Sequence, residues 1–84
     1  MDVPAYVMVN GYPPEAKGIN VTGLERRGFS KDAIRALRRA YKILYREGNT
    51  VEEALAAMQP LADEVPEVQA LIASVRASSK GILR

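Results

Sequence analysis

The amino-acid sequence changes character at Ser30, and this change most constrains how the chain can fold. Before Ser30 the apolar residues keep no helical period, and the stretch from Gly18 to Ser30 contains three glycines. After Ser30, apolar residues recur every three or four positions over most of the remaining chain. The sequence therefore predicts two parts, an extended and looped segment over residues 1–29 and a helical domain over residues 30–84.

The first part contains one segment that favours a strand. Residues 3–11 are rich in β-branched and aromatic side chains, with Pro4 near the start and Gly11 at the end. No second strand is evident, so we expect this strand to lack a neighbour and to be poorly ordered. Two prolines follow Tyr12, and residues 15–23 show no sustained period, which predicts a loop there.

The second part reads as three helices and predicts a small, mainly α domain. Ser30 is a suitable N-cap for the first helix and Gly48 a suitable stop. The buried side of this helix is predicted to consist of Ala33, Ile34, Leu37, Ala40, Tyr41 and Leu44.

The second and third helices have their own start signals. Thr50 and Glu53 form a capping box, and helical spacing continues across Pro60, which predicts one kinked helix or, alternatively, two shorter pieces. Pro66 suits the first position of the third helix, which ends in the stretch Ser78–Gly81. Its buried side is predicted to be Val68, Leu71, Ile72 and Val75. The tail, residues 82–84, is either frayed or docked.

The composition argues for binding and against catalysis by these residues. The chain has no histidine and no cysteine, which removes the commonest general base and the commonest metal ligands. We therefore expect no catalytic residue, no metal site and no cofactor among the 84 residues. No apolar run is long enough to span a membrane and the N-terminus does not resemble a signal peptide, so a cytoplasmic location is expected.

Positive charge is concentrated in the first half of the chain. Residues 1–46 hold nine Lys or Arg against four acids, whereas residues 47–84 hold three against six. Five of these cations form one side of the first predicted helix, here called the basic face: Arg35, Arg38, Arg39, Lys42 and Arg46. The basic face is either a solvated surface or a docking surface for an acidic partner.

Two functional classes remain open from the residues alone. Near the junction, Asn20, Thr22, Arg26 and Arg27 could hold an anion, although their chemistry alone favours an ordinary helix-entry loop with solvated arginines. The chain could also be a stand-alone basic module for nucleic acid or an acidic protein. Nucleic acid is the less favoured partner, because few aromatic residues accompany the cations and the second half is acidic.

Several runs of residues resemble one enzyme family. Residues 3–13 are similar to the closing coil of hexapeptide-repeat acyltransferases. The run Gly-Leu-Glu-Arg-Arg-Gly-Phe-Ser at 23–30 resembles the C-terminal region of UDP-N-acetylglucosamine acyltransferases, and residues 33–37, 40–42, 66–68 and 79–84 continue the similarity. The resemblance therefore covers essentially the whole chain.

The resemblance implies a place in lipid A biosynthesis. The family transfers a 3-hydroxyacyl chain from acyl carrier protein to the 3-hydroxyl of UDP-N-acetylglucosamine. It implies a cytoplasmic homotrimer in which a left-handed parallel β-helix precedes a helical C-terminal domain. This chain would be that domain with the last β-helix coil, and Met1 would be an added start. The family's catalytic histidine lies on the β-helix, so the isolated chain is expected to be inactive.

The resemblance also implies roles for particular residues. Asn20, Arg26 and Arg27 stand at positions that the family uses to bind the nucleotide-sugar, and guanidinium groups suit diphosphate recognition. Thr22 stands where a glutamate is common, so the contact of that glutamate is in doubt. The basic face would be a docking surface for acyl carrier protein, which is acidic.

Overall fold

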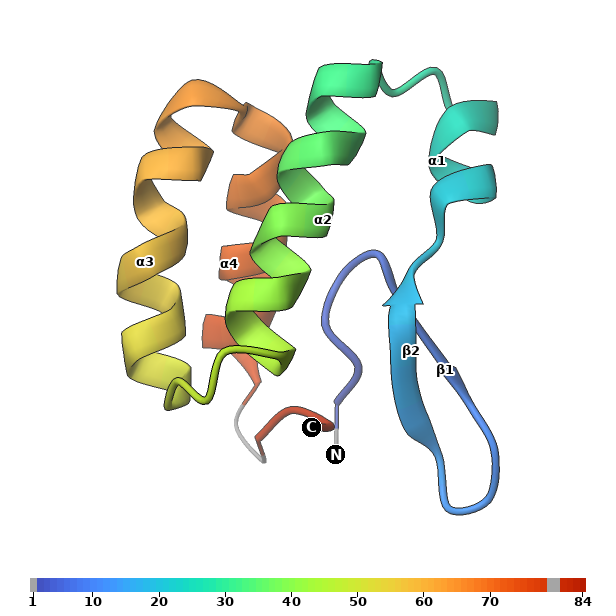
Figure 1. Ribbon diagram of the computed structural model, residues 1–84, viewed down its shortest axis with the longest axis vertical. Helices are drawn as coiled ribbons and strands as arrows, with labels where there is room; N and C mark the ends of the chain where they lie inside the picture. The colour runs from blue at the N-terminus through green and yellow to red at the C-terminus, as the bar shows by residue number, and fades with distance from the viewer. Residues whose placement is uncertain (1, 79–80) are drawn as a thin grey trace.

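The computed structural model describes residues 2–78 and 81–84, and its helices pack beside a small β-hairpin (Figure 1). The described part is mainly helical, which confirms the predicted fold class. Three residues lie outside the described part, namely Met1, Ser79 and Lys80. The sequence analysis interpreted Met1 as an added start and placed Ser79 and Lys80 at the end of the third helix. The elements in chain order are β1 (Val7–Asn10), β2 (Glu15–Ile19), α1 (Val21–Arg26), α2 (Lys31–Tyr45), α3 (Val51–Glu64) and α4 (Pro66–Ala77).

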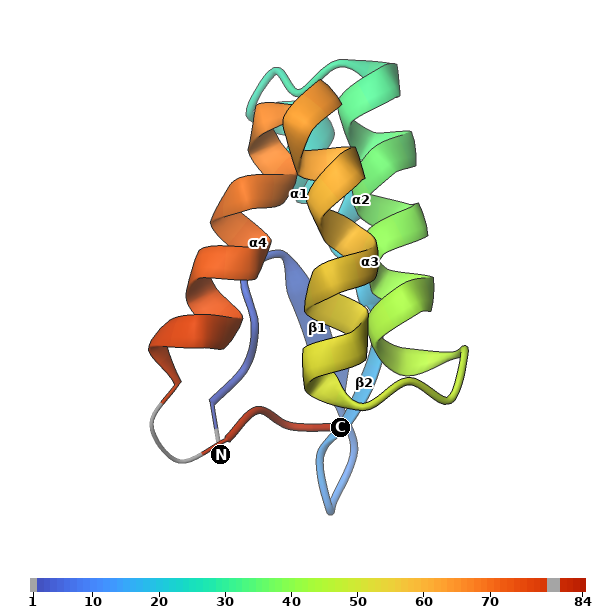
Figure 2. The ribbon, with the colours of Figure 1, turned by 90° about the vertical axis from the view of Figure 1, so that its left-hand side faces the viewer.

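Helices α2, α3 and α4 correspond to the three predicted helices and enclose the core (Figure 2). The helix α3 is continuous through Pro60, and the capping box of Thr50 and Glu53 is formed at its start. Hydrogen bonds from Thr50 lower the pKa of Glu53. All predicted core positions of α2 and α4 are buried, and Ala36, Ile43, Ala54, Leu55, Met58 and Ala62 join them.

The N-terminal part differs from the prediction. The loop predicted over residues 15–23 is wrong, because residues 15–19 form β2 and pair antiparallel with β1, with Val7 opposite Ile19. The predicted strand over residues 3–11 therefore has a neighbour in the same chain. Local sequence is weak evidence for such a strand, since cross-strand pairing supplies its stability. Residues 21–26 then form α1, a helix that the sequence analysis did not predict.

The C-terminal tail is docked, which settles the alternative left open above. Ile82 is buried and forms a parallel bridge with Asp2, and the Leu83 backbone N–H donates to the Asp2 carbonyl over 2.8 Å. The Tyr45 hydroxyl donates to the Leu83 carbonyl over 2.6 Å. Both described ends of the chain are thereby fastened to the end of α2.

Replacing Tyr45 by phenylalanine tests this fastening. Loss of the hydroxyl should lower the free energy of unfolding by about 1 kcal/mol, the usual worth of one hydrogen bond. Burial raises the pKa of Tyr45 to about 12, with Tyr41 adding to the rise and Arg84 opposing it. Because the pKa is raised in the folded state, Tyr45 contributes stability that is fully present below pH 10.0, the ordinary pKa of tyrosine. This contribution is lost as the pH rises through about 12.

Urea unfolding of both proteins at pH 7 and at pH values above 10 measures these effects. The difference in stability between the unsubstituted chain and Tyr45→Phe should shrink at the higher pH, because the hydroxyl is then progressively ionised. Equal stability of the two proteins at pH 7 would show that the tail is not held through Tyr45.

Candidate functional site

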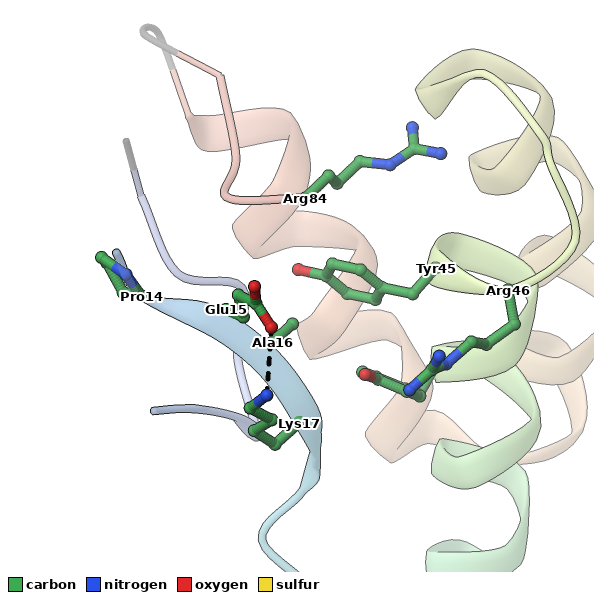
Figure 3. Close-up of a pocket in the computed structure, with 8 residues that line it drawn as sticks. Pro14, Glu15, Ala16, Lys17, Tyr45, Arg46 and Arg84 are labelled. Atoms are coloured by element: carbon green, nitrogen blue, oxygen red, sulfur yellow. Dashed lines mark hydrogen bonds and ion pairs between the residues drawn. The ribbon is translucent and has the colours of Figure 1, made fainter. Parts of the chain in front are cut away.

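Two cavities lie between the strand β2 and the helix α2. The first, here called the tail cavity, has a volume of about 410 Å³ and is drawn in Figure 3. It is lined by Pro14, Glu15, Ala16, Lys17, Tyr41, Tyr45, Arg46 and Arg84. The second, here called the Gly18 cavity, is also about 410 Å³ and is lined by Gly18, Ile19, Val21, Arg38, Tyr41, Lys42 and Arg46. Because the two share Tyr41 and Arg46, they form one groove along α2.

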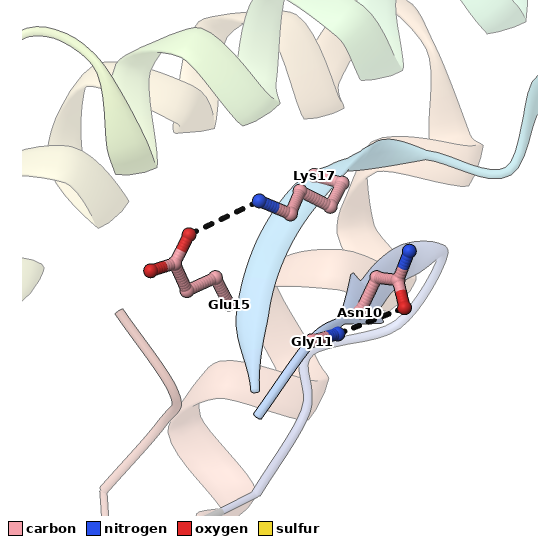
Figure 4. A network of polar contacts seen from close by, with 4 residues as sticks. All are labelled: Asn10, Gly11, Glu15 and Lys17. Atoms are coloured by element: carbon pink, nitrogen blue, oxygen red, sulfur yellow. Dashed lines mark hydrogen bonds and ion pairs between the residues drawn. The ribbon is translucent and has the colours of Figure 1, made fainter. Parts of the chain in front are cut away.

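Four polar side chains of the tail cavity are already engaged within the chain, whereas Arg46 has no carboxylate partner in the described residues. Lys17 and Glu15 form an ion pair at 3.0 Å on the hairpin, beside the contact of Asn10 with Gly11 (Figure 4). The Tyr45 hydroxyl is bonded to Leu83, and the Arg84 guanidinium donates to the Asn49 carbonyl. Figure 3 shows Glu15 and Lys17 on β2 across from Tyr45 on α2, and the Arg84 side chain extending away from β2. The tail cavity therefore holds few free charges.

The basic face of α2 is exposed, as predicted, but its five cations are not equivalent. Arg35 pairs with Asp32 at 3.2 Å, and Arg39 pairs with Glu47. Arg38, Lys42 and Arg46 have no carboxylate partner among the residues that the structure describes, and all three line the Gly18 cavity. The Arg46 guanidinium carbon lies 6.0 Å from the ring centre of Tyr41, which helps to position it.

Asn20 begins the helix α1. Its side-chain Oδ1 accepts from the Gly23 backbone N–H over 3.1 Å, and its own N–H donates to the Tyr6 carbonyl over 2.9 Å. A Cβ at position 23 would lie only 2.5 Å from Asn20 Nδ2, which explains why glycine stands there. The cap uses Oδ1, so Nδ2 is the group of Asn20 that remains for a ligand.

Arg26 and Arg27 lie at the other end of α1. Both are exposed, and neither has a carboxylate partner within residues 2–78 or 81–84. The Arg27 guanidinium carbon lies 5.2 Å from the ring centre of Phe29, whose ring meets that of Tyr6 edge-on at 5.8 Å. The Tyr6 hydroxyl donates to the Glu67 carbonyl, so this aromatic column connects Arg27 to the start of α4.

The structure does not bring all predicted site residues to one point. Asn20 and Arg27 are seven positions apart, which places them about 10 Å apart along α1. Thr22 is exposed in the first turn of α1. Asn20, Thr22, Arg26 and Arg27 line neither cavity of the groove, although their neighbour Val21 lines the Gly18 cavity.

Several residues of the groove were not singled out as site residues from the sequence. Ile19 and Val21 fall in the stretch assigned to a loop, and Tyr41 was assigned to the core only. The cross-strand pairing that shapes this wall has no clear signal in the sequence. Among the described residues, no three His, Cys, Asp or Glu side chains are grouped so that they could hold a metal ion. No helix of the described part has the length and apolar character needed to cross a membrane.

Comparison with known proteins shows the family to which the chain belongs. The model of domain 2 of UDP N-acetylglucosamine O-acyltransferase matches residues 2–83. An acyl-[acyl-carrier-protein]–UDP-N-acetylglucosamine O-acyltransferase of Pseudomonas aeruginosa is 54% identical over 83 residues, which is 99% of this chain and 32% of that protein. The corresponding protein of Azotobacter vinelandii is 53% identical over the same share. The chain thus spans about a third of the length of these relatives.

Solved structures give the same result for the fold. LpxA from Acinetobacter baumannii superposes with a TM-score of 0.94 at 45% identity, over 99% of this chain and 33% of that one. The UDP-N-acetylglucosamine O-acyltransferase (LpxA) from Moraxella catarrhalis gives a TM-score of 0.93 at 43% identity, over 99% and 32%. The hairpin and all four helices lie within the matched part.

Proposed function

We propose a function for this chain from the family to which it belongs, which is domain 2 of the UDP N-acetylglucosamine O-acyltransferases. The parent enzyme transfers an acyl group from acyl carrier protein to UDP-N-acetylglucosamine. This chain binds the nucleotide-sugar and the carrier protein for that reaction. The observation that carries this proposal is the match of residues 2–83 to the family, at 54% identity to a relative named for that reaction.

The residues at α1 support nucleotide-sugar binding. A diphosphate needs charge-assisted donors, and the guanidinium groups of Arg26 and Arg27 are exposed and free of carboxylate partners in the described part of the chain. The stacking of Arg27 on Phe29 reduces the conformational freedom that binding would have to remove. The Nδ2 group of Asn20 adds a neutral donor at the start of the same helix.

The residue types of this chain suit binding of the substrates and do not include a histidine general base. None of the 84 residues is a histidine, so a histidine general base must come from other polypeptide. The cytoplasmic location, the homotrimer and the origin of residues 1–29 as the last coil of a β-helix belong to the same proposal. The exposed apolar side chains of Val3, Met8 and Val9 would then be covered by neighbouring coils.

A titration separates this function from that of a stand-alone basic module. The purified chain is titrated with acyl carrier protein and with duplex DNA at two salt concentrations. Binding of the carrier protein without DNA binding supports the proposed function. DNA binding with a steep dependence on salt, in the absence of carrier-protein binding, supports the alternative.

Asn20→Asp tests the role of Asn20 in nucleotide-sugar binding. Aspartate caps a helix as well as asparagine does, so the thermal stability should be unchanged. The substitution removes the Nδ2 donor and places a negative charge in the proposed site for an anionic substrate, so the KM for UDP-N-acetylglucosamine should rise by about tenfold or more. The assay uses a hybrid enzyme in which this chain replaces the matching third of the Pseudomonas aeruginosa relative.

Asn20→Ser is the matched control, because serine keeps the cap and adds no charge. Its KM for UDP-N-acetylglucosamine should lie between those of the unsubstituted hybrid and Asn20→Asp. An unchanged KM in Asn20→Asp would show that Asn20 serves only as a cap.

A further inference from the structure

The guanidinium of Arg27 lies on a pair of aromatic rings that come from different parts of the chain. We infer that Phe29 and Tyr6 are positioning residues, which hold the Arg27 guanidinium where the nucleotide-sugar binds and do not contact the ligand themselves. This inference rests on the proposed function, because it adds to the site at α1 the residues that position one of its binding groups.

The first step concerns how Phe29 comes to lie beside Arg27. The Gly28 backbone N–H donates to the Glu25 carbonyl over 3.0 Å. The Phe29 backbone N–H donates to the Leu24 carbonyl over 3.1 Å. These two hydrogen bonds form a Schellman motif, which favours glycine at position 28, where φ is 84°. The chain therefore reverses after α1, and the Phe29 ring centre lies 5.2 Å from the guanidinium carbon of Arg27.

The second step concerns what holds the Phe29 ring. Phe29 is partly buried against the core, and its ring meets the Tyr6 ring at an angle of 70° with 5.8 Å between the centres. Edge-to-face contacts of this kind are favourable for aromatic rings. The Tyr6 hydroxyl donates to the Glu67 carbonyl over 3.2 Å, which ties the second ring to the start of α4. The Phe29 ring therefore offers the Arg27 guanidinium a fixed surface.

The third step concerns the backbone of Tyr6, which serves the other end of α1. Its carbonyl accepts from the Asn20 N–H over 2.9 Å. Its φ of 67° lies in the left-handed region, which is uncommon for a residue with a large side chain. The preceding Ala5 N–H donates to the Ser74 hydroxyl over 2.9 Å, a contact that helps to hold this conformation. Tyr6 thus connects the position of Asn20 to that of Arg27.

The fourth step concerns the neighbouring Arg26, which lacks this support. In residues 2–78 and 81–84, the two guanidinium groups that lie over an aromatic face belong to Arg27 and Arg46. A guanidinium on such a face is attracted to the ring and has fewer conformations to lose when a ligand binds. The contribution of Arg27 to binding should therefore depend on Phe29, whereas that of Arg26 should not.

A double-mutant cycle in the hybrid enzyme tests the inference. Phe29→Leu removes the ring and keeps an apolar side chain, so it should raise the KM for UDP-N-acetylglucosamine about threefold to tenfold and change kcat less than about twofold. In the Arg27→Ala background the same substitution should change the KM less than about twofold, because no guanidinium is left to position. In the Arg26→Ala background it should keep its full effect.

Two further variants separate the ring from its backing. Phe29→Tyr retains the aromatic face and should keep the KM within about twofold of the unsubstituted hybrid. Tyr6→Leu removes the ring behind Phe29 and should raise the KM about twofold to fivefold, again without effect in the Arg27→Ala background. Circular dichroism and thermal unfolding confirm that each variant is folded.

The outcomes separate this inference from the proposed function. A rise in KM for Phe29→Leu that persists in full in the Arg27→Ala background would overturn the inference, since Phe29 would then act independently of Arg27. An unchanged KM in Phe29→Leu or Tyr6→Leu, or an equal rise in Phe29→Tyr, would overturn it as well. In these cases the proposed function stands if Arg27→Ala still raises the KM. An unchanged KM in both Arg26→Ala and Arg27→Ala would contradict the nucleotide-sugar site at α1 and the inference together.

Discussion

Replacement of Leu37 by alanine is expected to lower the free energy of unfolding by about 2–5 kcal/mol. Leu37 lies in the middle of α2 and is completely buried in the core formed with α3 and α4. A domain of this size has a total stability of roughly 4–13 kcal/mol, so the loss is a large part of the whole. Urea unfolding followed by circular dichroism measures it.

The neighbouring residue provides the control. Arg38 is exposed on the same helix, so Arg38→Ala should change the stability by no more than about 0.5 kcal/mol. These adjacent positions of α2 have different surroundings, since Leu37 lies in the core and Arg38 lines the groove. A loss below about 1 kcal/mol in Leu37→Ala would contradict the packing described for the core.

Arg27→Ala and Arg26→Ala are expected to have the largest effects on function. Each should lower kcat/KM for UDP-N-acetylglucosamine in the hybrid enzyme roughly tenfold to 150-fold. This factor corresponds to a loss of about 1.5–3 kcal/mol of transition-state stabilisation. The reason is the loss of a charge-assisted hydrogen bond to the diphosphate. Neither arginine is paired with a carboxylate in the described residues, so its removal leaves no buried charge uncompensated.

Arg76→Ala serves as the control for charge. Arg76 is an exposed arginine in the last turn of α4 and lines neither cavity of the groove. Its replacement should leave kcat/KM for the nucleotide-sugar within about twofold. Unsubstituted kinetics in both Arg26→Ala and Arg27→Ala would show that α1 does not bind the nucleotide-sugar.

The helices could be predicted because several local signals agree. In α2 the cap at Ser30, the apolar spacing and the stop at Gly48 all indicate the same limits. In α3 the capping box fixes the start, and packing of the buried side keeps one helix through Pro60. Each of these features depends on residues that are close together in the chain.

The hairpin and α1 could not be predicted in the same way. The strand β2, Glu-Ala-Lys-Gly-Ile, has a weak strand propensity and depends on pairing with β1. The helix α1 has only six residues, which is too short for a periodic pattern. Because β2 forms one wall of the groove, the cavities along α2 could not be predicted either, although the cations of the basic face could.

Transfer of the acyl group by the hybrid enzyme tests the central claim most directly. The Pseudomonas aeruginosa relative is assayed with its matching third deleted, with that third replaced by this chain, and beside this chain alone. We predict that only the hybrid transfers an acyl group from carrier protein to UDP-N-acetylglucosamine. A correctly folded hybrid without activity, or turnover by this chain alone, would contradict the claim that these residues bind the substrates and leave the chemistry to other polypeptide.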